Sequence, residues 1–163
     1  MKPTVFTRFL GIVLLSWFSM LGFDFFLHAG ILAPLYARPS RFLLPPDEAF
    51  ALIPLGYLSF LVSAAMLVWL VRKLGIETWR EGLMFGLTFG ALGGGSLALS
   101  LLSITTADPI LMVGWFFGQT FQSGIAGLVV GASLGTDKLG RMFIRVLLFV
   151  IGSIAGGIVL QNL

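Results

Sequence analysis

Five long apolar stretches dominate this chain and restrict the folds open to it. They cover residues 10–35, 50–71, 82–102, 110–134 and 146–160. An α-helix needs about 20 apolar residues to cross a bilayer core of about 30 Å, and each stretch approaches or exceeds that length. Because 58% of the residues are hydrophobic and only 10% are charged, the chain has too few charged residues to cover the surface of a water-soluble protein. We predict an all-α membrane protein with one transmembrane domain over residues 1–163.

The fifth stretch, residues 146–160, is the shortest and closely follows Arg141 and Arg145. It contains no charged residue, and backbone exposed to lipid has to be helical to satisfy its own hydrogen bonds. We therefore expect an antiparallel bundle of five transmembrane helices. The alternative is four spans followed by an interfacial C-terminal helix.

Basic residues are distributed unevenly among the connections between the stretches. The first and third connections contain only Arg38 and Arg41, while the N-terminus and the second and fourth connections contain Lys2, Arg8, Arg72, Lys73, Arg80, Lys138, Arg141 and Arg145. The positive-inside rule then predicts a cytoplasmic N-terminus and, with five spans, a C-terminus outside. We expect a multi-pass protein of the cell (inner) membrane that has an uncleaved first helix. Its basic residues face lipid headgroups, and we expect no nucleic-acid partner.

Local signals mark where several helices begin and end. Gly75 follows the second stretch as a helix stop. Thr78 and Glu81 have the spacing of a capping box before the third, and Asp108 precedes Pro109 as an N-cap before the fourth.

Glycines recur at helical spacing in the last three stretches. Lipid gives helices little hydrophobic reason to associate, so faces of small residues that permit close approach hold such bundles together. We expect the third, fourth and fifth helices to pack closely, with a homodimer face as the alternative use of the same glycines. The packing positions are Gly82, Gly86, Gly90, Gly94, Gly118, Gly127, Gly131, Gly152 and Gly156.

The first stretch contains a carboxylate and the chain's only histidine, Asp24 and His28, four residues apart. A charged side chain at the centre of a bilayer costs about 2.5–3.5 kcal/mol on insertion scales, so Asp24 requires a partner. A rise of 1.5 Å per residue places both side chains in the outer half of the membrane. The same count adds further polar residues at that depth or near the midplane, and we predict a pocket open to the outside that contains Asp24, His28, Tyr57, Ser100, Gln119 and Gln122.

Structural roles for these residues remain open alternatives. Asp24 and His28 can form a pair that shares a proton, and the two glutamines can bond between helices. Membrane serines such as Ser100 commonly bond to their own backbone.

The sequence lacks the patterns of the common enzymes. It contains no cysteine, no HExxH, no GxSxG and no phosphate-binding loop. We expect no enzymatic activity and no metal centre. A lone membrane histidine can ligate haem or a chlorophyll-type pigment, so His28 is the candidate ligand if such a cofactor binds.

The aspartate in Gly22-Phe23-Asp24-Phe25-Phe26, the following Pro34-Leu35-Tyr36, Tyr57 and the glycine-rich third helix occur in this order. Over residues 10–134 this arrangement resembles a family of small bacterial four-span membrane proteins of unknown function. The segment Leu-Ser-Ile-Thr-Thr-Ala-Asp-Pro stands where those proteins tend to have Asp-Leu-Thr-Asn. The resemblance implies a helical membrane architecture and no particular activity.

Three functional hypotheses follow. The first is a non-enzymatic membrane protein that binds a small or lipidic ligand in the outer-half pocket, or that serves as an accessory subunit of a larger complex or homo-oligomer. The second is a small transporter or channel component in which Asp24 is the proton or cation site. The third is a haem- or pigment-binding subunit that uses His28.

Overall fold

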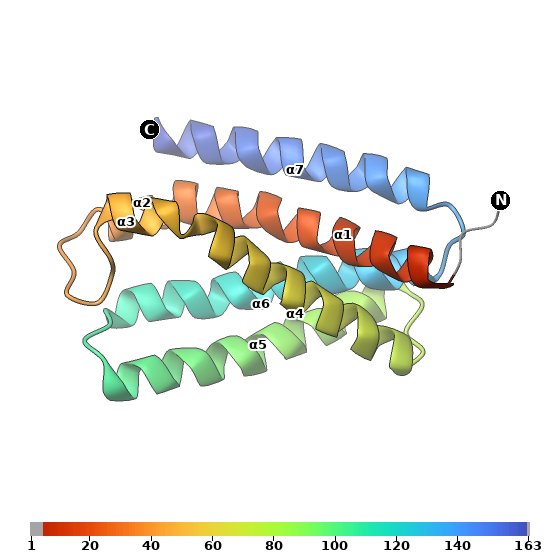
Figure 1. Cartoon of the computed structure of the whole chain (residues 1–163), viewed down its shortest axis with the longest axis horizontal. Coiled ribbons are helices and arrows are strands. Elements are labelled where there is room, and N and C mark those ends of the chain that lie inside the picture. The colour runs from red at the N-terminus through yellow and green to blue at the C-terminus, as the bar shows by residue number, and fades with distance from the viewer. Residues whose placement is uncertain (1–4, 163) are drawn as a thin grey trace.

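A computed structural model describes residues 5–162, and in this part of the chain all regular secondary structure is helical, with no strand (Figure 1). The segments are α1 (Val5–Asp24), the π-helix η1 (Phe25–Ile31), α2 (Ala33–Tyr36), α3 (Pro46–Ala51), α4 (Ile53–Lys73), α5 (Trp79–Ile104), α6 (Pro109–Leu134) and α7 (Leu139–Gln161). Lys2, which contributes to the predicted N-terminal charge, lies outside the described residues.

Four helical segments of the described chain are long and apolar enough to cross a membrane: Val5–Ile31, Ile53–Lys73, Trp79–Ile104 and Leu139–Gln161. The C-terminal helix α7, for which an interfacial position was the alternative, is one of these four. Helix α6 has the same length as α5, 26 residues. It is not among these four segments.

The predicted first span is not one regular helix. At Phe25 the α-helix passes into a π-helix, in which the Leu32 N–H bonds the Leu27 carbonyl at 2.8 Å. Pro34 lacks the N–H that an α-helical ladder would donate to Gly30, so a regular helix cannot continue through it. The wider π-turn ends at Ile31, and a short new helix places Tyr36 beyond it.

The predicted second span is also divided, into α3 and α4, with the break at Leu52. Pro54 again removes an N–H, here the one that would reach the Phe50 carbonyl. The fifth helix is longer than predicted and begins at Leu139 instead of residue 146. Arg141 and Arg145 lie exposed in its first turns, where long basic side chains can extend to water.

The predicted helix ends are confirmed. Thr78 is the N-cap of α5, and its Oγ1 accepts a hydrogen bond from the Glu81 N–H and donates one to Glu81 Oε2 at 2.7 Å. Asp108 Oδ1 accepts from the Ile110 N–H at 2.7 Å at the start of α6. Gly75, just after α4, has a φ of 69°, which favours glycine.

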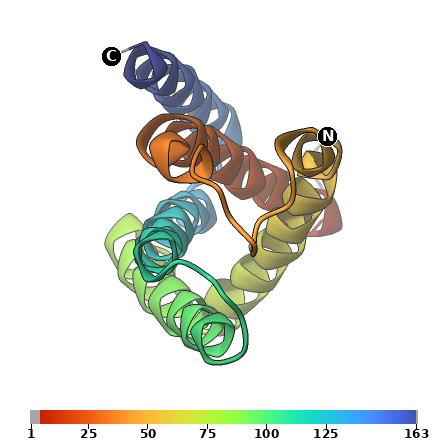
Figure 2. The same ribbon diagram turned by 90° about the vertical axis from the view of Figure 1, so that its left-hand side faces the viewer.

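Helices α5 and α6 lie side by side at very close range (Figures 1 and 2). A Cβ on Gly82 would overlap the Gly127 carbonyl oxygen, and one on Gly86 would overlap that of Ser123. Towards the other end, a Cβ on Gly94 would lie 2.9 Å from the Gln119 Cβ. The glycine face of α5 is therefore covered by α6 and is not available to a second copy of the chain.

Helix α7 lies outside this pair and packs chiefly on α1 and η1 (Figure 2). The expectation that it packs with α5 and α6 through Gly152 is wrong, since nothing lies within 4 Å of a Cβ built there. A Cβ on Gly22 of α1 would lie 2.9 Å from Val150 Cγ2. Gly156 and its neighbour Gly157 instead receive the rings of Phe26 and Phe25.

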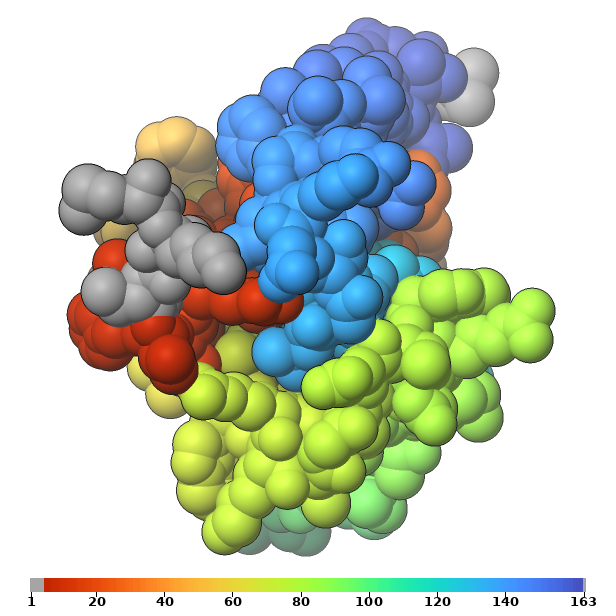
Figure 3. Space-filling model, turned by 90° about the vertical axis from the view of Figure 1, so that its right-hand side faces the viewer, coloured from red at the N-terminus to blue at the C-terminus, as the bar shows by residue number. Residues whose placement is uncertain are grey.

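One end of the molecule brings together the start of α1, the α4–α5 connection and the α6–α7 connection (Figure 3). There the Arg8 guanidinium donates to Asp137 Oδ1 at 2.9 Å and to backbone carbonyls at the end of α6, including that of Thr136 at 2.8 Å. Arg8 thus caps the C-terminus of α6 and joins α1 to the α6–α7 connection.

Candidate functional site

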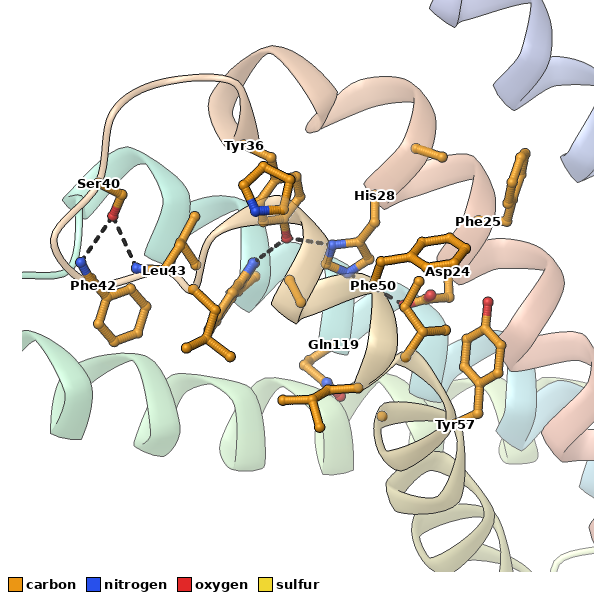
Figure 4. Close-up of a pocket in the computed structure, with 18 of the residues that line it drawn as sticks. Asp24, Phe25, His28, Tyr36, Ser40, Phe42, Leu43, Phe50, Tyr57 and Gln119 are labelled. Carbon is orange, nitrogen blue, oxygen red and sulfur yellow. Dashed lines mark hydrogen bonds and ion pairs between the residues drawn. The ribbon is translucent and has the colours of Figure 1, made fainter.

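A cavity of about 1630 Å³ lies at the opposite end of the molecule (Figure 4). It is partly open, and it is lined by residues of α1, η1 and α2, by α3 and the first half of α4, and by one face each of α5 and α6. The connection of residues 37–45 runs across its outer end. Most of the wall is apolar, and the polar side chains come from a few positions on α1, η1, α2, α4, α6 and the connection of residues 37–45.

Asp24 and His28 lie together on the wall formed by α1 and η1. Asp24 Oδ1 is 3.4 Å from His28 Nε2, and His28 Nδ1 is 2.5 Å from the hydroxyl of Tyr36. The Trp115 indole N–H of α6 donates to the same hydroxyl at 2.6 Å. The π-turn and the break at Leu32 bring Tyr36 back over His28, so that four side chains form one continuous polar chain.

Proton positions along this chain follow from what each group can donate. The Trp115 indole only donates, so the Tyr36 oxygen accepts from it. With a neutral His28, either Tyr36 donates to Nδ1 and the Nε2–H faces an ionised Asp24, or a protonated Asp24 faces Nε2 and the Nδ1–H donates to Tyr36. The second arrangement leaves the Tyr36 hydroxyl proton free for another acceptor. The chain can therefore hold a proton at more than one place.

Tyr36 itself lies beyond the four segments that could cross a membrane. Burial raises the pKa of its hydroxyl to about 12, the hydrogen bond from Trp115 lowers this pKa, and the negative charge of Asp24 raises it. The hydroxyl is thus a neutral hydrogen-bonding group at physiological pH.

The glutamines of α6 differ in their surroundings. Gln122 is buried, and its amide Nε2 donates to the Met20 carbonyl of α1 at 3.2 Å. Gln119 is half-buried on the cavity wall, and among the described residues neither its amide nor the Tyr57 hydroxyl has a hydrogen-bond partner. Both groups extend into the cavity near Asp24 (Figure 4).

Five of the six predicted site residues, Asp24, His28, Tyr57, Gln119 and Gln122, line this one cavity. Ser100 does not. It is exposed on another side of α5, and its carbonyl accepts a hydrogen bond from the Ser103 hydroxyl at 2.8 Å.

Sequence reasoning missed Tyr36 and Trp115 as members of the site. Tyr36 follows the first apolar stretch directly, and an indole N–H inside an apolar helix needs an acceptor. These two signals together could have found the pair.

The structure bears on the cofactor alternatives as well. Both ring nitrogens of His28 have partners within the chain, so haem or pigment ligation would have to break one of these contacts. The described residues contain no group of three or more side chains suited to holding a metal ion.

Comparison of this chain with protein-family models, with curated proteins and with solved structures gives no match. Fold and cavity define a class only: an all-helical protein with several helices able to cross a membrane and a partly open cavity at one end. The resemblance to the four-span family stays a prediction.

Proposed function

We propose that this chain is a five-span membrane protein that binds an amphipathic, lipid-sized ligand in the cavity between η1, α4, α5 and α6. The observation that supports this best is the cavity itself. At about 1630 Å³ it exceeds the 300–1000 Å³ typical of pockets for drug-sized molecules. Apolar walls with polar groups gathered around Asp24 suit a ligand that has a long apolar part and a polar head. The proposal involves no chemical step.

The arrangement of α6 supports a fifth span. It is as long as α5 and lies along it, and its buried Gln122 bonds to α1 instead of facing lipid. Arg8, Arg72, Lys73 and Arg80 belong to one end of the molecule, where α1 begins and α4 meets α5. We place that end in the cytoplasm by the positive-inside rule, so that the cavity opens on the outer side.

The natural absence of cysteine allows a direct test of this topology in the full chain. Thr106→Cys lies in the α5–α6 connection, Asn162→Cys follows α7, and Glu77→Cys lies in the α4–α5 connection. A membrane-impermeant maleimide added to intact cells should label the first two and should reach Glu77→Cys only after permeabilisation. Labelling of Asn162→Cys and Glu77→Cys from the same side would contradict an odd number of spans.

Ligand binding is tested by native mass spectrometry of the chain extracted gently from membranes. Leu97 lines the cavity, whereas Leu99 is an exposed residue of the same helix outside it. We expect the unaltered chain and Leu99→Trp to retain a lipid-sized adduct. Leu97→Trp should lose it, because the indole fills part of the cavity. Equal retention by both variants would place the ligand elsewhere.

The polar chain from Asp24 through His28 to Tyr36 favours a second candidate, a proton or cation site in a small transporter. Intramembrane carboxylates commonly serve proton relays. In proteoliposomes with a pH gradient, Asp24→Asn should abolish proton-coupled flux. A flux that is independent of pH and equal in this variant would refute the transport candidate and leave ligand binding as proposed.

A further inference from the structure

Asp24 has fewer hydrogen-bond donors and opposite charges around it than a carboxylate in apolar surroundings requires. Its side chain is only 15% exposed, and its one polar contact among the described residues is His28, 3.4 Å away. No lysine or arginine pairs with it in that part of the chain. A carboxylate has about four acceptor positions, so most of them remain available on the cavity side. Burial of such a group is expensive unless an opposite charge or several hydrogen-bond donors approach it.

The neighbouring polar groups include oxygen atoms that can accept hydrogen bonds. Gln122 donates one amide N–H to the Met20 carbonyl, and its amide oxygen has no partner among the described residues. The Tyr57 hydroxyl and the Gln119 amide have no partner among the described residues and lie across from Asp24 (Figure 4). A charged group with several N–H donors could bond to Asp24 and to more than one of these oxygens at once.

Aromatic rings surround the same place. Phe25, Phe50 and Phe60 line the cavity around Asp24 and Tyr57. Ring faces carry a negative quadrupole that attracts cations, and the attraction is stronger when the cation is desolvated. An anionic head would instead meet the carboxylate of Asp24 and these ring faces. The arginine that lines the cavity, Arg38, belongs to the outer connection and is exposed.

We propose that the polar head of the ligand is an ammonium group bearing N–H donors, held by Asp24, Tyr57 and the α6 glutamines while the apolar part of the ligand lies along α4 and α5. This inference rests on the proposed function, since it names the head group of a ligand for the same cavity. A primary ammonium has three donors, one for Asp24 and two that can reach the neutral oxygens of Tyr57, Gln119 and Gln122. The positive charge of the ammonium group supplies the counter-charge that Asp24 lacks among the described residues.

Four amphiphiles of equal chain length separate the head groups: dodecylammonium, dodecyltrimethylammonium, dodecanol and dodecanoate. Binding to the full chain is measured by native mass spectrometry in a neutral polyoxyethylene detergent at pH 8, where the micelle itself attracts neither charge. Alkylamines resemble lysine, with a pKa of about 10.4, and are protonated there. We expect dodecylammonium to bind about tenfold or more tightly than any of the other three, as a charge-assisted hydrogen bond predicts.

Asp24→Asn keeps the shape of the side chain and removes its charge. It should abolish the preference for dodecylammonium over dodecanol, whereas Asp47→Asn, on the exposed surface of α3 outside the cavity, should keep it. If Asp24→Asn does not give a monodisperse helical protein, Tyr57→Phe takes its place, because it removes only a hydroxyl without a partner among the described residues. A reduction of the dodecylammonium preference by about threefold is then expected.

The outcomes are distinct. Equal or tighter binding of dodecanol or dodecanoate by the unaltered chain overturns the ammonium proposal and leaves an amphiphile site in place. An unchanged preference in folded Asp24→Asn, or in Tyr57→Phe where that variant is needed, also overturns it. Tighter binding of dodecyltrimethylammonium assigns the selectivity to the rings and overturns the role of the N–H donors. If none of the four amphiphiles binds, the proposed function itself fails.

Discussion

The contact between α5 and α6 gives the sharpest prediction about stability. A Cβ at Gly86 would overlap the Ser123 carbonyl oxygen and would lie 2.9 Å from its carbonyl carbon and 3.0 Å from the Gly124 Cα. All three atoms belong to backbone, which cannot rotate away as a side chain can. The variant Gly86→Ala therefore forces the two helices apart. Gly93 of the same helix has nothing within 4 Å of its Cβ position and provides the control.

The expected magnitude has two parts. Overpacking by one methyl group costs about 1–3 kcal/mol. Because the obstacle at Gly86 is backbone of the facing helix, we expect the overpacking cost of Gly86→Ala to be about 3 kcal/mol. Alanine is favoured over glycine inside a helix by about 1 kcal/mol, which both variants gain. We expect Gly86→Ala to lower the free energy of unfolding by about 2 kcal/mol and Gly93→Ala to raise it by up to about 1 kcal/mol, a difference of about 3 kcal/mol.

Equilibrium unfolding in mixed micelles of dodecyl sulfate and a neutral detergent measures this difference, with tryptophan fluorescence and circular dichroism as the signals. The comparison of two Gly→Ala changes in one helix cancels most effects of the unfolded state. Equal unfolding midpoints for Gly86→Ala and Gly93→Ala would refute the close α5–α6 packing. A destabilised Gly93→Ala would indicate instead that this exposed face is in contact with another chain.

Three further predictions concern groups outside the cavity walls or at their edge. The Tyr36 pKa of about 12 lies above the usual 10.0, so the folded state keeps a proton that the unfolded state loses, and stability should fall as pH rises from about 10 to 12. Absorbance at 295 nm should show one of the two tyrosines ionising near pH 12, and this transition should be absent in Tyr36→Phe. Ionisation of Tyr36 near pH 10 would count against its burial. Thr78→Ala removes the N-cap of α5 and should cost about 1 kcal/mol in the same unfolding assay, and no loss would contradict the cap. Arg8→Ala leaves carbonyls at the end of α6 without their donor and should destabilise by about 1–2 kcal/mol, more than Asp137→Ala, which removes only an exposed ion-pair partner.

The predicted depth of the polar residues along the expected spans was sufficient to find most residues of the candidate site. Polar side chains are expensive in lipid, so residues such as Asp24 and Gln122 must face protein or water wherever the helices lie. Both residues line the cavity, as their predicted depth indicated. Depth does not determine the face of the helix, however. Ser100 lies at a comparable height but is exposed, because the cavity face of α5 is formed by Gly94, Leu97 and Ala98.

The approach of Tyr36 to His28 could not be predicted from helical spacing. It depends on the shift from α- to π-helical hydrogen bonds between Leu27 and Leu32, followed by a new start at Ala33. A proline such as Pro34 indicates that a regular ladder is interrupted, but several outcomes satisfy the freed carbonyls equally well: a kink, a π-turn or a helix end. Tertiary contacts with α6, among them the Trp115 hydrogen bond, select one of them.

Small residues on α7 misled the sequence prediction for a related reason. A glycine stripe indicates that some helix can approach closely, but it does not identify that helix. On α5 the partner is the glycine face of α6. On α7 it is the aromatic pair Phe25 and Phe26 of the π-helix, which fit against Gly157 and Gly156. The presence of bulky rings on the partner was the deciding feature, and the wide π-turn presents both rings to one neighbour.

The position of the cavity follows from where the small residues and the apolar core end. At the Arg8 end, α4 is held against α1 and α6 by a core that includes Ala64, Leu67, Val68 and Val71. The first half of α4 contributes no buried residue to any such core. It is free to diverge because Pro54 interrupts the helix before it. On the opposite wall, close α5–α6 contact continues as far as Gly94, where a Cβ would press on Gln119. The close contact thus sets the Gln119 amide facing the space that the diverging α4 leaves open. A larger residue at position 94 should displace this amide from the cavity wall before it separates the helices.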